Sequence, residues 1–96
     1  MKTTIVINVP ASGRKLYNRN VVIPTGARVK ITDESKKYEM FILRNNSDSV
    51  VFIGDQNVDS QNGFPVLPKE VFVLNVYQEL YAYAEDNDVD LRIMEG

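Results

Sequence analysis

Apolar residues recur at every second position through most of this 96-residue chain. Near the C-terminus, for example, Val89, Leu91 and Ile93 alternate with residues of the opposite face, which is typical of a strand with one buried side. No run of ten or more residues repeats its apolar positions at helical spacing. The pattern predicts eight short strands, at residues 3–9, 21–23, 27–32, 38–44, 49–53, 71–76, 80–84 and 89–94.

Polar turns separate these strands, and no linker or repeat divides the chain. Residues 10–20 are expected to form a polar loop, and residues 85–88 the turn before the last strand. Short strands at this spacing favour an all-β fold. We therefore predict a single domain over residues 1–96, built as a small antiparallel β-sandwich or a jelly-roll-like barrel of about eight short strands.

The chain contains no cysteine and no histidine. Disulfides, cysteine-based zinc sites and Ser–His–Asp catalysis are therefore excluded within it. The acidic residues fall in predicted turns and on outward strand positions, where the carboxylates would be ionised at neutral pH. We expect no enzyme activity, no cofactor and no metal, because a carboxylate enzyme would need two acids in a desolvating pocket.

No apolar run approaches the roughly 20 residues of a membrane span, and the N-terminal sequence does not resemble a signal peptide. Neither a glycine-rich dinucleotide motif nor a P-loop occurs. Five basic residues surround Tyr17 in the sequence, which raises the possibility of nucleic-acid binding, but they are spread over two loops and a strand. They are Arg14, Lys15, Arg19, Arg28 and Lys30. We expect no nucleic acid and no membrane as a partner.

The charges are distributed unevenly along the chain. Residues 1–44 hold nine basic and three acidic side chains, whereas residues 45–96 hold two basic and ten acidic ones. Either the two halves interleave as neighbouring strands and attract each other, or they create a dipolar surface that steers docking. The first interpretation is favoured, since both halves of a small β domain usually share one core.

Residues 86–90 carry three aspartates and an asparagine, as the start of a calcium loop does. An EF-hand loop needs glycine at its sixth position and glutamate at its twelfth. Leu91 occupies the sixth position, and the twelfth would lie beyond Gly96. A hairpin turn is therefore favoured over a weak divalent-cation site.

Tyr77, Tyr81 and Tyr83 form a small aromatic group near the C-terminus. Tyr81 and Tyr83 share one face of a predicted strand, opposite Ala82 and Ala84. If the alanines point inward, both tyrosines are accessible to a glycan or a protein partner. If the tyrosines point inward, they fill the core. The sequence leaves the two orientations open.

Residues 54–70 form a long connection between two strands. Its Asp and Asn side chains can bond their own backbone, which predicts an ordered loop whose exposed tip spans residues 56–61. Gln56, Asn57, Asp59 and Gln61 are candidate partner or glycan contacts, together with Tyr81 and Tyr83. Beyond the tip, the apolar side chains at positions 64, 66 and 67 are expected to fold back over the core.

The order VxxGxxxVxxxxGFPLxPxE, followed by LYAxA and VxLRxxE, resembles small all-β virion proteins of tailed bacteriophages. In this chain Val66 stands between Pro65 and Leu67 and shifts the spacing of that order by one residue. The resemblance covers roughly the C-terminal half of the chain. It rests on Val51, Gly54, Val58, Gly63, Phe64, Pro65, Leu67, Pro68, Glu70, Leu80, Tyr81, Ala82, Ala84, Leu91, Arg92 and Glu95. Lys69 occupies a position where such proteins more typically have glycine, and this favours a type I turn after Pro68.

The resemblance implies a non-enzymatic structural protein of the virion, of the capsid-decoration or head-fibre type, assembled in the bacterial cytoplasm. Its expected partners are major capsid or tail proteins and further copies of itself. The alternative is a carbohydrate-binding β-sandwich module that adheres to a glycan through Tyr81 and Tyr83.

Overall fold

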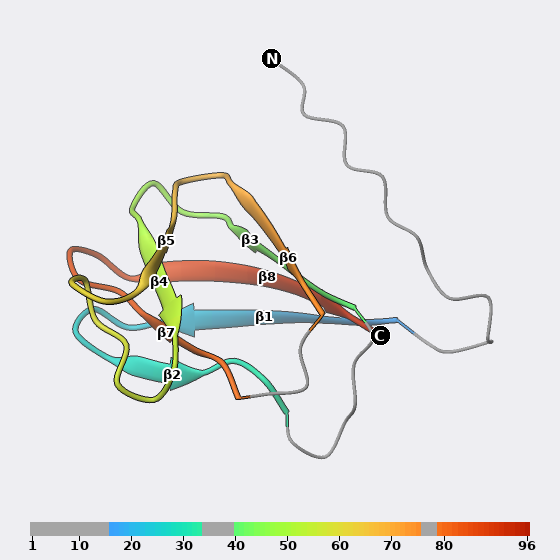
Figure 1. Cartoon of the computed structure of the whole chain (residues 1–96). Coiled ribbons are helices and arrows are strands. Elements are labelled where there is room, and N and C mark those ends of the chain that lie inside the picture. Colours follow the sequence, from blue (N-terminus) through green and yellow to red (C-terminus); the bar gives the residue numbers. More distant parts are fainter. Residues whose placement is uncertain (1–15, 34–39, 76–78) are drawn as a thin grey trace.

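In the computed structural model, the described residues 16–33, 40–75 and 79–96 form eight β-strands (Figure 1). The strands are β1 (Tyr17–Ile23), β2 (Arg28–Lys30), β3 (Phe41–Asn45), β4 (Val51–Gly54), β5 (Phe64–Val66), β6 (Val71–Leu74), β7 (Tyr81–Tyr83) and β8 (Val89–Glu95). The predicted all-β class is therefore confirmed.

The strands form two antiparallel sheets of four. Sheet 1 has the order β1-β8-β3-β6, and sheet 2 has the order β2-β7-β4-β5. The pairs are nested along the chain, because β4 pairs with β5, β3 with β6, β2 with β7 and β1 with β8. This nesting is the topology of an eight-stranded jelly roll.

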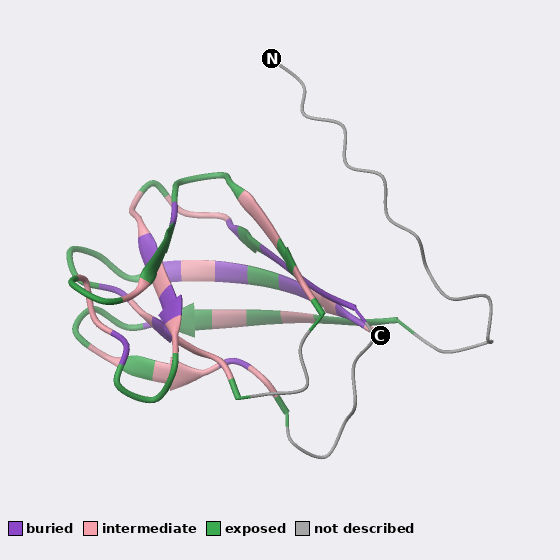
Figure 2. Ribbon diagram, in the orientation of Figure 1, coloured by how far each residue is buried: buried purple, intermediate pink, exposed green. Residues whose placement is uncertain are grey.

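The core lies between the two sheets and follows the alternation of the sequence. Val89, Leu91 and Ile93 of β8 are buried, and the residues between them are more exposed, as the banding of this strand in Figure 2 shows. The buried cluster consists of Ile23, Ile31, Phe41, Leu43, Val51, Ile53, Val66, Ala82, Ala84, Val89, Leu91 and Ile93. Complete burial of each branched aliphatic or aromatic side chain contributes about 1.5–3 kcal/mol.

The two oppositely charged halves of the chain meet inside this fold. The fully buried carboxylate of Glu95 accepts hydrogen bonds from Arg19 Nε at 2.8 Å and Arg19 Nη2 at 3.1 Å. Arg19 Nη2 also donates to the carbonyl of Ile31, just beyond β2, so this guanidinium links the two sheets. Lys30 pairs with Glu79 at 3.2 Å. The halves thus interleave and attract each other, as the favoured interpretation of the charge pattern predicts.

Asn45 is the fully buried polar residue at the end of β3. Its Nδ2 donates to the carbonyls of Ser49 at 2.7 Å and Val66 at 3.0 Å, and its Oδ1 accepts the Ser47 N–H at 3.1 Å. Its backbone N–H donates to the carbonyl of Glu70, and its own carbonyl accepts the N–H of Lys69. One residue therefore fastens the β3–β4 turn, β5 and the β5–β6 turn to sheet 1.

The predicted strands differ from the structure in two places. Residues 17–20 belong to β1 and not to the expected 10–20 loop, because Tyr17 to Asn20 pair with Glu95 to Arg92 of β8. The connection also contains an unpredicted strand, β5, at the edge of sheet 2, where the missing N–H of Pro65 is tolerated. The predicted strand at residues 3–9 lies outside the described residues, as do positions 38, 39 and 76 of two others.

The expected cover of the core by residues 64, 66 and 67 is only partly found. Val66 is fully buried, whereas Phe64 is 56% exposed and Leu67 is 54% exposed. Val66 is aligned with Val51 on the inward face of sheet 2. Phe64 lies at the far end of the same edge strand, and Leu67 lies beyond it, so both reach the margin of the core.

The turn between β5 and β6 is type II, and the expectation of type I is wrong. The Glu70 N–H bonds the Leu67 carbonyl at 3.0 Å, Pro68 is the first central residue, and Lys69 has φ +65°. The last residue of β3 and the residue after it hold this lysine in the left-handed conformation. Its N–H donates to the Asn45 carbonyl at 2.7 Å, and its Nζ donates to the Asn46 carbonyl at 3.0 Å.

Comparison of Lys69→Gly with Lys69→Ala isolates this backbone strain, since both variants lose the lysine amine. We expect the glycine variant to be the more stable of the two by about 1 kcal/mol, because only glycine adopts the left-handed region without cost. Urea denaturation followed by circular dichroism measures the difference. An alanine variant at least as stable as the glycine variant would contradict the type II assignment.

Candidate functional site

The 54–70 connection is ordered by its own side chains, as predicted. The Asp55 carboxylate accepts the Asn57 N–H at 2.9 Å, which forms an Asx turn. Asp59 Oδ1 accepts the N–H groups of Gln61 at 2.8 Å and Asn62 at 3.0 Å. In return, Asn62 Oδ1 accepts the Asp59 N–H at 2.9 Å.

This loop packs on the outer face of sheet 2. Val58 is only 1% exposed and lies against Gly54 and Gly63. A Cβ atom at Gly63 would stand 2.6 Å from the Phe52 Cβ, so the close approach requires glycine there. Arg28 of β2 donates its Nε–H to the Val58 carbonyl and so ties the loop to the far edge of the sheet. The loop is thus a fixed part of the domain surface.

The predicted contact residues of the loop differ in what they leave accessible. Gln56, Asn57 and Gln61 are exposed at the tip. Asp59 is half-buried, and its Oδ1 is already engaged by two backbone N–H groups. The tip therefore presents uncharged amides to a partner, while Asp59 shapes the turn.

The structure defines which face of β7 points into the core. Ala82 and Ala84 are fully buried, and Tyr81 and Tyr83 lie half-buried on the outer face of sheet 2. The Arg28 guanidinium lies over the Tyr83 ring, with Cζ 5.5 Å from the centroid. Because Arg28 also bonds the loop, the structure brings the tyrosines and the 54–70 connection onto one face, which spacing in the sequence did not indicate.

An exposed apolar surface lies on the side of the sandwich where β5 and β6 end the two sheets. We call Phe64, Leu67, Phe72 and Val73 the β5–β6 surface. The Phe64 and Phe72 ring centroids are 5.1 Å apart, and Phe64, Leu67 and Val73 are each at least half exposed. Alternation in the sequence does not indicate this surface, although the uncharged run VFVL of β6 is typical of an unprotected edge strand.

The opposite edge of sheet 1 is more polar. The β1 strand carries Asn18, Arg19 and Asn20, although Val22 is 58% exposed on its outer face. Polar and charged side chains on an edge strand disfavour pairing with another chain. The two edges therefore differ, and β6 is the one suited to accept a partner strand.

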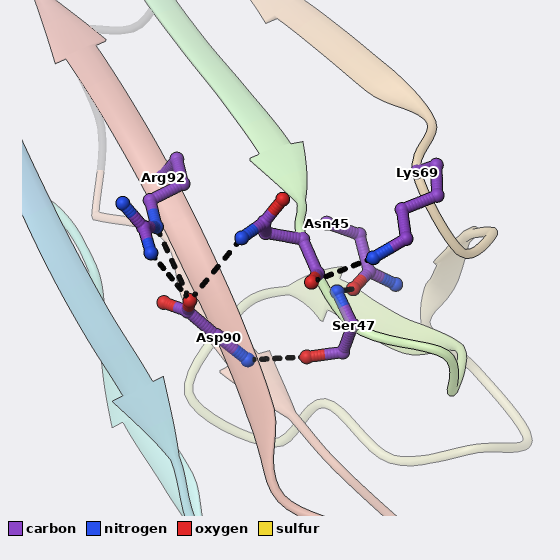
Figure 3. Close-up of polar contacts among 6 residues, drawn as sticks. Asn45, Ser47, Lys69, Asp90 and Arg92 are labelled. Atoms are coloured by element: carbon purple, nitrogen blue, oxygen red, sulfur yellow. Dashed lines mark hydrogen bonds and ion pairs between the residues drawn. The ribbon is translucent and has the colours of Figure 1, made fainter.

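A polar network occupies the outer face of sheet 1. The Arg92 guanidinium is directed at the Asp90 carboxylate, with Nε and Nη2 each 3.1 Å from Oδ2, as Figure 3 shows. The Asp90 N–H donates to Ser47 Oγ at 2.6 Å, which joins β8 to the β3–β4 turn. Asp90 points outward, as predicted, and is engaged by its neighbours.

The turn before β8 has a structural role in this fold. Asp88 accepts hydrogen bonds from the Thr25 N–H and Thr25 Oγ–H, both at 2.8 Å, and these bonds lower the pKa of its carboxyl. No group of three His, Cys, Asp or Glu residues that could hold a metal ion is found in the described part of the chain. Nor does that part contain a helix long and apolar enough to cross a membrane.

No protein-family model matches the chain, and no curated protein or solved structure is detectably similar to it. The resemblance to phage virion proteins therefore stays a prediction.

Proposed function

We propose that this chain is a non-enzymatic structural protein of a tailed-phage virion, and that it assembles through the β5–β6 surface. The observation that carries the proposal is the exposed apolar edge formed by Phe64, Leu67 and Val73. Jelly rolls include viral coat domains, but they also include lectins, so the fold alone is an argument by analogy.

The backbone of β6 gives this surface its docking chemistry. Within the described sheet, β6 pairs with β3 on one side only. Its outward N–H and C=O groups can therefore bond an added strand, while Val73 packs beside it. The Phe64 and Phe72 rings, which contact each other in a tilted arrangement, supply the kind of aromatic contact that contributes most to interfaces.

The partners that fit this chemistry are further copies of the chain and the major capsid or tail proteins of the particle. Strand addition on one edge of a compact domain suits a small module that attaches to a larger lattice. Arg19, Lys30 and Arg92 already form ion pairs within the domain. We therefore expect the contact between the β5–β6 surface and its partner to be largely apolar and backbone-mediated.

Val73→Lys tests the proposal against a matched control, Val22→Lys. Both valines lie on outer faces of the two edge strands of sheet 1, and they are 50% and 58% exposed. We expect the wild-type protein to self-associate. The β6 variant should weaken association at least tenfold, because a lysine protects a strand edge. The β1 variant should leave it unchanged. Sedimentation velocity over a range of concentrations measures all three.

A wild-type protein that stays monomeric and fails to bind capsids or other virion proteins would contradict the proposal. Equal weakening by both lysine variants would also contradict it, because the effect would then follow net charge and not the β5–β6 surface.

A second candidate function, glycan binding, is favoured by the outward placement of Tyr81 and Tyr83. The two aromatic rings lie on the face of sheet 2 to which Arg28 ties the 54–70 connection, and they can stack on a sugar, while the exposed amides of Gln56 and Asn57 in that connection can hydrogen-bond to it. In this interpretation the outer face of sheet 2, and not the β5–β6 surface, is the functional one.

Glycan-array binding should disappear in Tyr83→Ala if this second function operates, since the variant removes one stacking ring. Tyr17→Ala, which alters a tyrosine of sheet 1, should retain binding. An array on which the wild-type protein gives no signal above background excludes the candidate.

A further inference from the structure

The outer face of sheet 1 contains a hollow of about 360 Å³. It lies over β1, β8 and β3, beside the polar network of Figure 3. Its lining consists of Asn18, Arg19, Asn20, Ile42, Arg44, Arg92, Ile93 and Met94. Of these residues, only Arg19 is among the basic residues that surround Tyr17 in the sequence.

Two arginines stand side by side in this hollow. Arg44 of β3 and Arg92 of β8 are directly opposite each other in the antiparallel register, and Asn20 of β1 is opposite Arg92 on the other side. Like charges in directly opposite positions repel each other. An anion that contacts both guanidinium groups would remove that repulsion.

The two guanidinium groups have hydrogen-bonding capacity to spare. Arg92 donates from Nε and Nη2 to the Asp90 carboxylate, and its Nη1 group is available to donate to a ligand. Within residues 16–33, 40–75 and 79–96, the side chain of Arg44 has no hydrogen-bond or ion-pair partner. Asp90 compensates for one of the two positive charges, so the described part of the hollow keeps a net positive charge.

The remaining lining is apolar or amide. Ile42 and Met94 are opposite each other in the next row of the sheet, with Asn18 beside Met94. Ile42 is only 7% exposed although it lies on the outer face. A ligand for this surface therefore carries an anionic group next to an aliphatic one, and can accept or donate hydrogen bonds to amides.

We propose that this hollow receives the carboxylate of an acidic peptide segment from a partner protein. Arginine binds a planar carboxylate with two parallel hydrogen bonds, and an adjacent aliphatic side chain would cover the partly exposed Met94. Apart from Arg19 and Ile93, whose side chains belong to the inward face, the described lining comes from one face of three strands, which can accept a side chain but does not enclose a small molecule. Among the residues that the structure describes, the lining has no aromatic ring to stack a nucleic-acid base.

Titration of the ¹⁵N-labelled protein with the peptide Ac-Gly-Ser-Leu-Glu-Leu-Ser-Gly-NH2 tests the proposal. We expect chemical-shift changes confined to the hollow and affinity that falls as salt rises. Arg44→Gln should weaken binding at least tenfold, whereas Lys30→Gln, which removes a cation from sheet 2, should not change it. The matched peptide with glutamine in place of glutamate should not bind.

Arg44→Glu separates binding from folding. It places opposite charges at the pair with Arg92, so its thermal midpoint should be no lower than that of the wild type, and peptide binding should be lost. Retained peptide binding in this folded variant would overturn the proposal. So would equal affinity for glutarate or inorganic phosphate, or a dimer that Arg44→Gln dissociates, since the face would then serve a small anion or a second copy.

The proposal is independent of the virion role. Leu67→Lys, which alters the β5–β6 surface at a residue outside the lining of the hollow, should still bind the peptide, so failure of one proposal is distinguishable from failure of the other.

Discussion

The buried side chain of Asn45 is the interaction on which the arrangement of this jelly roll depends. Its amide bonds the carbonyls of Ser49 and Val66 and the N–H of Ser47, and its backbone bonds Lys69 and Glu70. These bonds join β3 to both turns beside it and to β5. A buried amide without partners costs about 1–3 kcal/mol for each unsatisfied group, so arrangements of the surrounding chain that leave this amide unpaired are disfavoured.

This arrangement determines which strands end the sheets. The turn that Asn45 and Lys69 hold in place carries the chain from the edge of sheet 2 to the edge of sheet 1, and so places β5 and β6 on one side of the sandwich. The rings of Phe64 and Phe72 meet there and remain partly accessible. The surface proposed for assembly is thus a direct consequence of the turn, and the strain at Lys69 lies next to it.

The sequence predicts those parts of the fold that alternation alone determines. The inward faces of β2 and β8 follow from period-two patterns, because a half-buried strand requires them. The first residues of β1 were missed because Tyr17 to Asn20 lack that pattern and are paired by β8, about 75 residues away in the chain. The strand β5 was not predicted because Pro65 disfavours a strand assignment. The left-handed conformation of Lys69 was not predicted because it accompanies a hydrogen bond to Asn45, which is distant in the sequence.

The candidate sites were predictable to a smaller extent. Loop chemistry correctly indicated an ordered connection, since Asx turns are local. The contact between Arg28 and that loop, the proximity of Phe64 to Phe72 and the pair of Arg44 and Arg92 all depend on strand register. Register is a property of the assembled sheets, so these surfaces emerge only from the structure.

Urea denaturation of Asn45→Ala beside Asn46→Ala tests the central claim most directly. The two residues are neighbours of the same type, but Asn46 is only partly buried and its side chain makes one long contact, 3.5 Å to Asp90. Loss of the Asn45 amide should lower the free energy of unfolding by about 2–4 kcal/mol, and loss of the Asn46 amide by less than about 1 kcal/mol. Equal losses in the two variants would contradict the claim that Asn45 holds the sandwich together.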